Sequence, residues 1–327
     1  MIKLFRNAHP FHVLLLLGIT VILRFAYMAH LPAIVPQPLT ALLQQLLVTN
    51  AYQIYVNPFN SVIAAGIIVF VQALLFNIII NKYNILGKQT YLPAMFFIIC
   101  CSVLSPFLTL SLPLLANFIL LYIFNKILSS YKQANAITIF FDIGLAIGLS
   151  TIVYFPLLLL LLWVWLCLIV LRPFYWREWL SPVIAFLLTP FFLLVFYYYN
   201  ERLNLMLRFW QPLYSPLKIF INVQVSTYWP LLPLFIVLVL GFVQLRLNFF
   251  KTFVLVRKTF IVLLLLAILI IFSFYINPAF SLSHFTLLAI PVATLCAYYF
   301  LNARLKWIYE ILFYLILIFV IYFQWTG

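Results

Sequence analysis

The feature that most constrains this 327-residue chain is a series of apolar runs, each about long enough to cross a lipid bilayer. About 20 apolar residues in a helix cover the roughly 30 Å of hydrocarbon in a membrane. Hydrophobic residues make up 68% of the chain and charged residues only 7%, which excludes an ordinary soluble domain. The sequence therefore predicts an all-α, polytopic transmembrane helix bundle that forms one integral membrane domain over residues 1–327.

The number of helices follows from the apolar runs and their interruptions, and we predict about 11. Pro106 and Pro156 interrupt longer apolar stretches and predict tight hairpins there. No small-residue cleavage site follows the first run, which therefore reads as an uncleaved helix. The predicted spans are residues 11–29, 59–80, 91–105, 107–124, 138–154, 156–171, 180–199, 229–245, 259–275, 285–302 and 307–325.

The basic residues predict the orientation, because short cytoplasmic loops collect Lys and Arg. With the N-terminus inside, the cytoplasmic side carries Lys3, Arg6, Lys82, Lys88, Lys126, Lys132, Arg172, Arg177, Arg246, Lys251, Arg257, Lys258, Arg304 and Lys306. The outer side carries only Arg202, Arg208 and Lys218, and Arg24 lies within the first helix. We therefore predict a cytoplasmic N-terminus and a periplasmic C-terminus. Without a basic soluble face, membrane lipids are the predicted partners of this charge, and nucleic acid is not.

Two outer loops, at about residues 30–58 and 200–228, are longer than most other connections. Each contains an amphipathic stretch that predicts a helix lying on the membrane surface. The apolar stripe of the first consists of Leu39, Leu42, Leu43, Leu46 and Leu47, and that of the second of Leu203, Met206, Leu207 and Trp210. A simpler reading is that both loops only cover helix ends.

Arg24 is the most unusual charged residue, because it lies about 20 Å along the first helix, in the outer half of the hydrocarbon layer. Its side chain either extends to the outer interface or faces the bundle and offers its guanidinium to a phosphate group. On the opposite side, Arg172 and Arg177 belong to LRPFYWREW at residues 171–179. This turn is either an interfacial aromatic anchor or a lipid headgroup site.

The remaining charged residues suggest few kinds of chemistry. Asp142 lies one turn into its helix, where an ion pair with Lys126, Lys132 or Arg172 is favoured, and Gly144 and Gly148 predict close approach of a neighbouring helix. Glu201 is the only acid on the outer side, and is therefore the one candidate for a catalytic base there.

Several functional classes are disfavoured by the sequence. The central parts of the spans carry no ionisable residue, which argues against an ion-coupled transporter, and they lack the polar lining of a channel. The four His residues fall on both sides of the membrane and cannot converge on one iron. Nucleophile motifs and Gly-rich phosphate loops are absent. The sequence predicts no metal site and no cofactor.

Four segments carry a resemblance that spans most of the chain. They are NPFNSVIAAGIIVFVQALLFNIIINKYNILGKQTYLPAMFF, SPFLTLSLPLLANFILLYIFNKI, FFDIGLAIGLSTIVYFP and LRPFYWREWLSPVIAFLLTPFF. Together they resemble an uncharacterised family of multi-spanning inner-membrane proteins from Bacteroidetes-type bacteria. The resemblance implies a bacterial inner-membrane location and a shared fold.

The placement of the two outer loops, after the first and the seventh helix, resembles the GT-C glycosyltransferases. These enzymes take sugars from polyprenyl-phosphate donors at the outer face of the membrane. LRFAYMAHLPAIVP, which contains Arg24, looks like the end of their first helix, where an arginine precedes a loop that carries catalytic acids. Residues 30–58 contain no Asp or Glu here, so the resemblance implies that the acid is lost or is relocated to Glu201.

Two functions follow as expectations. The first is a protein of GT-C-like shape in cell-envelope glycan handling, with or without catalysis, that binds a polyprenyl-phosphate lipid. Arg24, Arg202 and Arg208 would neutralise its phosphate, and if the protein is an enzyme it is a glycosyltransferase with a lipid-linked sugar donor. The second is a non-catalytic structural or assembly subunit that docks another membrane protein.

Overall fold

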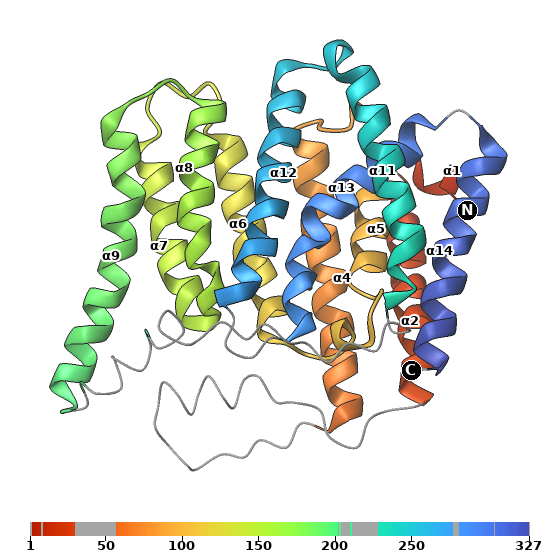
Figure 1. The fold of residues 1–327 in the computed structure, drawn as a ribbon, viewed down its shortest axis with the longest axis horizontal. Coiled ribbons are helices and arrows are strands. Elements are labelled where there is room, and N and C mark those ends of the chain that lie inside the picture. Colours follow the sequence, from red (N-terminus) through yellow and green to blue (C-terminus); the bar gives the residue numbers. More distant parts are fainter. Residues whose placement is uncertain are drawn as a thin grey trace.

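The computed structural model describes residues 2–7, 9–29, 57–201, 203, 210, 228–276, 281–303 and 305–326. In these ranges all regular structure is helical (Figure 1). The α-helices are α1 (Ile2–Phe5), α2 (His12–Ala29), α4 (Pro58–Lys82), α5 (Leu92–Cys100), α6 (Leu112–Ser129), α7 (Ile137–Val153), α8 (Leu160–Leu171), α9 (Trp176–Tyr199), α11 (Leu231–Asn248), α12 (Val254–Ser273), α13 (Ala289–Asn302) and α14 (Lys306–Thr326). Short 3₁₀ segments are η1 (Ser105–Phe107), η2 (Phe155–Leu159), η5 (Phe249–Lys251), η6 (Phe274–Ile276) and η7 (Leu282–Leu288).

The prediction of an all-helical, multi-pass membrane protein is confirmed. In the described ranges, eight helices are long and apolar enough to cross a membrane. They are α2, α4, α6, α9 and, with their adjoining 3₁₀ turns where present, α11, α12, α13 and α14. The other predicted spans correspond to α7, to α8 with η2, and to α5, all of which are shorter.

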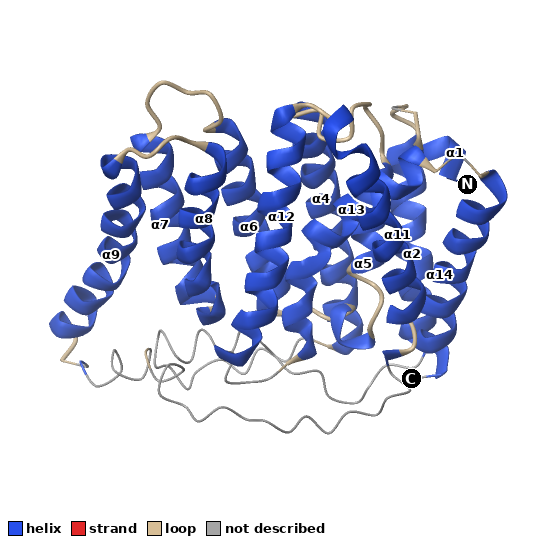
Figure 2. Cartoon of the chain, turned by 45° about the horizontal axis from the view of Figure 1, so that its top comes forward, coloured by secondary structure: helices blue, strands red, loops and turns tan. Residues whose placement is uncertain are grey.

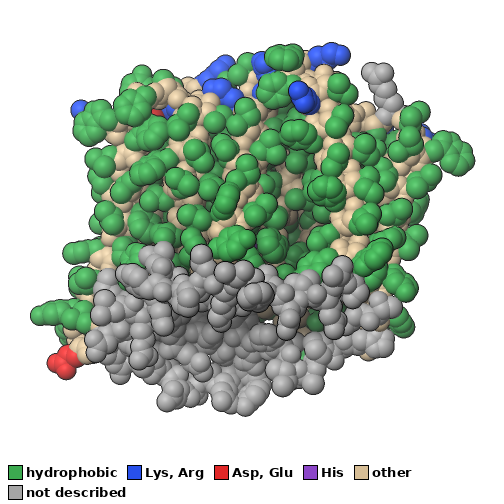
Figure 3. All heavy atoms as spheres, in the orientation of Figure 1, with side chains coloured by type: hydrophobic (Ala, Val, Ile, Leu, Met, Phe, Trp, Pro, Cys, Tyr) green, Lys and Arg blue, Asp and Glu red, His purple; other side chains and the backbone are tan. Residues whose placement is uncertain are grey.

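The helices lie side by side and run alternately up and down (Figures 1 and 2). The N-terminus lies on the upper side and the C-terminus on the lower side, with α9 at one edge of the bundle and α2 and α14 at the other. On the visible face, Lys and Arg side chains lie along the upper edge and apolar side chains cover the flanks (Figure 3). The one-sided distribution predicted from the sequence is therefore present in the fold. We call this upper side the basic face.

The two long loops predicted at residues 30–58 and 200–228 begin and end at helices whose ends lie on the lower side, opposite the basic face (Figure 1). The amphipathic helix predicted within residues 39–47 lies outside the described residues, and so does most of the one predicted around residues 201–211.

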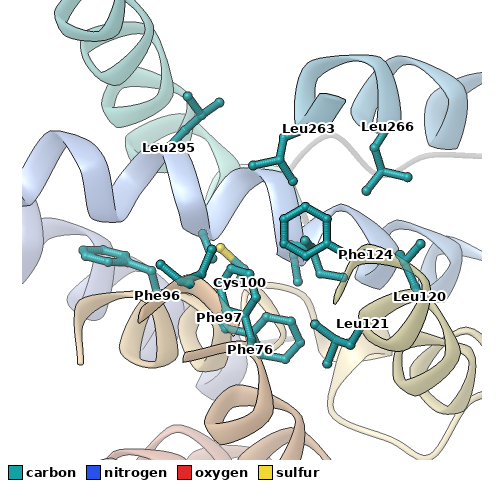
Figure 4. Close-up of a cluster of buried hydrophobic side chains, with 14 of the residues drawn as sticks. Phe76, Phe96, Phe97, Cys100, Leu120, Leu121, Phe124, Leu263, Leu266 and Leu295 are labelled. Carbon is teal, nitrogen blue, oxygen red and sulfur yellow. The ribbon is translucent and has the colours of Figure 1, made fainter. Parts of the chain in front are cut away.

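Apolar side chains from α4, α5, α6, α12 and α13 form the centre of the core (Figure 4). The cluster in this view includes Phe76, Phe96, Phe97, Cys100, Leu120, Leu121, Phe124, Leu263, Leu266 and Leu295. All nine residues of α5 are buried, so this helix lies inside the bundle with no face toward lipid.

Helices α7 and α9 pack closely at two glycines. A methyl group at Gly144 would collide with the backbone oxygen of Pro182 and would lie 2.7 Å from its Cα atom. A methyl group at Gly148 would collide with the Thr189 hydroxyl and lie 2.8 Å from Thr189 Cβ. The close helix approach predicted from this glycine pair is confirmed. The predicted ion pair of Asp142 is also confirmed, with Lys126 Nζ 2.8 Å from its Oδ2 atom.

Helix α5 differs from the predicted span 91–105, because it ends at Cys100 after nine residues. At 1.5 Å per residue it is about 13 Å long, less than half of the hydrocarbon thickness. A helix continuing to Pro106 would place the proline ring against the carbonyl of Ser102. The chain instead proceeds through irregular backbone and η1 to the start of α6 at Leu112. The interruption therefore lies within the membrane-spanning bundle.

Candidate functional site

Arg24 lies on the buried stripe of α2, less than two turns before the helix ends at Ala29. Its side chain is only 2% exposed, whereas the neighbouring Ile22 and Phe25 are exposed on the lipid side of the same helix. The sequence left two directions open for this side chain, and in the structure it points into the bundle.

Gly66 of α4 makes the space that the arginine occupies. A methyl group at this position would lie 3.2 Å from Cδ and 3.4 Å from Nε of Arg24. Such distances are shorter than ordinary van der Waals contact, so any larger residue at position 66 would push the guanidinium away. The sequence analysis did not identify Gly66. The available signal was the run of small residues Ala64, Ala65 and Gly66 in a helix that faces the first span.

The guanidinium has no partner in the described part of the chain. Nε, Nη1 and Nη2 of Arg24 are all buried and none of them has a hydrogen-bond acceptor there. Helix α2 also packs against α5, which ends in the same part of the bundle with the buried residues Cys100 and Cys101. Because transferring a cation into a protein interior costs several kcal/mol, an arrangement of this kind calls for a counter-anion or ordered water. We call the buried guanidinium of Arg24, together with Gly66 beside it, the Arg24 site.

The interruption after α5 leaves polar groups inside the bundle, next to helices that pack against α2. Ser102 Oγ is buried without a partner, and the Ser102 carbonyl accepts a hydrogen bond from Gln324 Nε2 of α14 at 2.6 Å. Ser61 Oγ accepts one from the Leu110 amide at 3.0 Å. Irregular backbone at membrane depth persists only where protein or water satisfies its polar groups. The C-terminal end of α5, a helix that packs against α2, carries a partial negative charge and no full one.

Toward the C-terminal end of α2, the neighbours of the Arg24 site are hydrophobic residues. Tyr27, Val62 and Leu108 form a small buried cluster that is separate from the main core, with Met28 packed against it. Tyr27 follows Arg24 by three residues and Val62 precedes Gly66 by four, so this cluster lies about one helical turn from the site. A group bound to the guanidinium would therefore be surrounded by apolar side chains on that side.

On the basic face, Arg172 and Arg177, the two arginines predicted as a lipid headgroup site, lie in different environments. Arg172 is buried and donates to both carboxylate oxygens of Glu178 at 2.7 Å, while its Nη1 atom donates to the carbonyls of Ser130 and Gln133. Arg177 is exposed, and its guanidinium carbon lies 5.6 Å from the centroid of the Trp176 ring. The phosphate role of both arginines stays a prediction, but four of the five donors of Arg172 are already used.

Glu201 is exposed and follows the end of α9 with a left-handed backbone angle φ of 56°. Helix α9 lies at the opposite edge of the bundle from α2, so the structure does not bring Glu201 beside Arg24 (Figures 1 and 2). Arg202 and Arg208 lie outside the described residues. The catalytic role of Glu201 stays a prediction.

The ring of His284 is the centre of a second group of buried polar side chains, near the lower side of the bundle. Tyr154 Oη donates to Nδ1 of His284 at 2.7 Å, and His284 Nε2 lies 2.9 Å from the Ile270 carbonyl oxygen and 3.0 Å from Ser273 Oγ. The carbonyl contact places the ring proton on Nε2. Both ring nitrogens are thus satisfied, which indicates a structural connection between η2, α12 and η7.

No protein-family model matches the chain, and comparisons with curated proteins and with solved structures gave no significant match. The resemblances drawn from the sequence therefore stay predictions. The geometry of the Arg24 site carries the functional argument that follows.

Proposed function

We propose that this chain is a multi-pass membrane protein that binds the phosphate group of a lipid at the Arg24 site. The observation that carries the proposal is the buried guanidinium of Arg24, which has no acceptor among the described residues. Arginine presents a rigid, planar fork of donors that matches two phosphate oxygens at once. A bound phosphate would supply both the missing acceptors and the missing negative charge.

The surroundings favour a lipid over a free anion. The cluster of Tyr27, Val62 and Leu108 beside the site is apolar and would contact a hydrocarbon chain rather than water. The site lies away from the basic face, which supports a position in the outer half of the membrane under the positive-inside rule, and a bacterial inner membrane is part of the proposal. A polyprenyl-phosphate lipid, which is handled there in cell-envelope glycan pathways, combines the required charge and apolar chain. A GT-C-like arrangement of the helices is part of this proposal.

The proposed activity is binding, with or without catalysis. Arg24 and the only outer-side acid, Glu201, belong to helices at opposite edges of the bundle (Figure 1). A single site that uses both residues is therefore not supported by the fold. The assembly role, in which the protein docks another membrane protein, stays an alternative prediction.

The proposal is tested by measuring binding of undecaprenyl phosphate to the purified full chain in detergent by native mass spectrometry. Undecaprenol serves as the same chain without phosphate, and inorganic phosphate as the same charge without a chain. We expect binding of undecaprenyl phosphate alone. If undecaprenol binds equally well the phosphate is not recognised, and if inorganic phosphate binds equally well the ligand is not a lipid.

Variants locate the binding at the Arg24 site. Arg24→Met should weaken binding roughly 100-fold, because two charge-assisted hydrogen bonds are lost. The same change should leave the ligand-free protein equally stable or more stable by about 1 kcal/mol or more, because a buried unpaired cation is removed. Gly66→Ala should also weaken binding, whereas Gly18→Ala, whose new methyl group meets open space, is the matched control. Unchanged binding in Arg24→Met would refute the proposal.

A further inference from the structure

Two lysines on the basic face share one aromatic ring. Lys132 Nζ lies 5.7 Å and Lys258 Nζ lies 5.6 Å from the ring centroid of Tyr131. Because both distances end at the same centroid, the two ammonium groups are at most about 11 Å apart. Tyr131 and Lys132 follow the end of α6, and Lys258 lies in the second turn of α12. Two separate elements thus bring these charges together.

The turn that contains Tyr131 is fixed by hydrogen bonds to the buried ion pair of Arg172 and Glu178. Arg172 Nη1 donates to the carbonyl oxygens of Ser130 at 2.6 Å and Gln133 at 2.9 Å, on either side of the presented residues. Glu178 Oε1 accepts the Ala136 amide at 3.1 Å. These hydrogen bonds fix the backbone of the turn, so the position of Tyr131 is determined by the fold before a ligand binds.

No acid neutralises the two lysines. In the described ranges the ion pairs within 4 Å are those of Lys126 with Asp142 and of Arg172 with Glu178. Lys258 makes one long contact of 3.4 Å to the Leu171 carbonyl oxygen, and Lys132 is exposed. Two like charges held near one ring without a carboxylate form a site that attracts an anion.

We propose that Lys132 and Lys258, which both lie beside the ring of Tyr131, bind the headgroup phosphate of an anionic phospholipid in the leaflet at the basic face. The depth of Lys258 supports a lipid, because it belongs to a helix that crosses the membrane and lies one turn inside the helix start at Val254. Ile261 follows it by three residues on the same helix face and is exposed, where an acyl chain would contact it. This site is independent of the Arg24 site and lies on the other side of the bundle.

The experiment compares lipid binding to two double variants that lose the same charge. The purified full chain is incubated in detergent with phosphatidylglycerol or with phosphatidylcholine, and bound lipid is counted by native mass spectrometry. Lys132→Gln/Lys258→Gln removes the proposed site. Lys3→Gln/Lys251→Gln removes two exposed lysines of α1 and η5, elsewhere on the basic face, and is the control.

We expect wild type to bind phosphatidylglycerol in preference to phosphatidylcholine. Binding to the Lys132→Gln/Lys258→Gln variant should be about 25-fold weaker, since each lysine near an anionic lipid contributes roughly a five-fold factor. The control should change less than about two-fold. Equal losses in both variants would mean a diffuse charge effect and would overturn the proposal. Competition by glycerol phosphate as strong as that by the lipid would assign the site to a soluble anion instead.

Discussion

The close contact of α7 and α9 predicts that a single methyl group will destabilise the protein. In Gly144→Ala the new Cβ atom collides with the backbone oxygen of Pro182 and lies 2.7 Å from Pro182 Cα and 2.8 Å from Ala185 Cβ. Backbone atoms cannot rotate away as a side chain can. Helix α9 must therefore move outward by roughly 1 Å to restore ordinary contact distances of about 3.5–4.0 Å.

The magnitude follows from two opposing terms. Inserting a methyl group into a packed interface typically costs about 1–3 kcal/mol, and a gap of up to 1 Å loses a quarter to a half of the affected dispersion energy. Alanine in place of glycine in a helix returns about 1 kcal/mol. We expect Gly144→Ala to lower the free energy of unfolding by about 1–2 kcal/mol. The double variant Gly144→Ala/Gly148→Ala should lose less stability than the sum of the two single variants, because the first methyl group has already moved α9 outward.

The measurement is unfolding of the purified variants in mixed micelles with increasing SDS, followed by circular dichroism. Gly18→Ala is the control, because its methyl group meets no atom within 4 Å and only the helix propensity changes. It should be as stable as wild type or more stable. Equal stability of Gly144→Ala and Gly18→Ala would refute the packing argument, and full additivity in the double variant would show that the two contacts are independent.

The remaining predictions concern buried and exposed polar pairs, and the same unfolding assay checks them. Glu178→Gln should lower the free energy of unfolding by about 3–5 kcal/mol, because it leaves the Arg172 charge buried and unpaired. Asp142→Asn should lower the free energy of unfolding by at most about 1 kcal/mol, because the ion pair of Asp142 with Lys126 is partly exposed. Equal losses of stability in Asp142→Asn and Glu178→Gln would contradict this reasoning. Tyr154→Phe should cost about 1–3 kcal/mol by leaving His284 Nδ1 without its donor, and no loss would indicate that water replaces the hydroxyl.

Much of the architecture was predictable, because the membrane imposes strong rules on sequence. Apolar runs located the helices, since each span needs apolar side chains in the hydrocarbon layer and satisfies its backbone polar groups by hydrogen bonds within the helix. The positions of the lysines and arginines predicted the basic face, and the glycine pair at positions 144 and 148 predicted a close contact of α7 with a neighbouring helix, which the structure identifies as α9. These features depend on composition and spacing along one segment. They do not require knowledge of which helices are neighbours.

The candidate sites were only partly predictable, because they depend on pairs of distant residues. Arg24 was recognised from its position in an apolar run, but its inward direction follows from packing against Gly66, which is 42 positions later in the chain. The sequence predicted one continuous span over residues 91–105, whereas α5 ends at Cys100. The Ser102 carbonyl that this leaves outside a helix accepts a hydrogen bond from Gln324 of the last helix, and no sequence rule shows that these two residues meet.

The sequence by itself determined that this chain crosses a membrane many times and that its positive charge lies on one side. Hydrophobic burial and charge placement act locally, so they can be read residue by residue. Only the tertiary structure decided which charges are already paired and which are not. Arg172 is satisfied by Glu178 and two carbonyls, whereas Arg24 has no acceptor among the described residues. That difference is set by the neighbours that folding brings to each guanidinium.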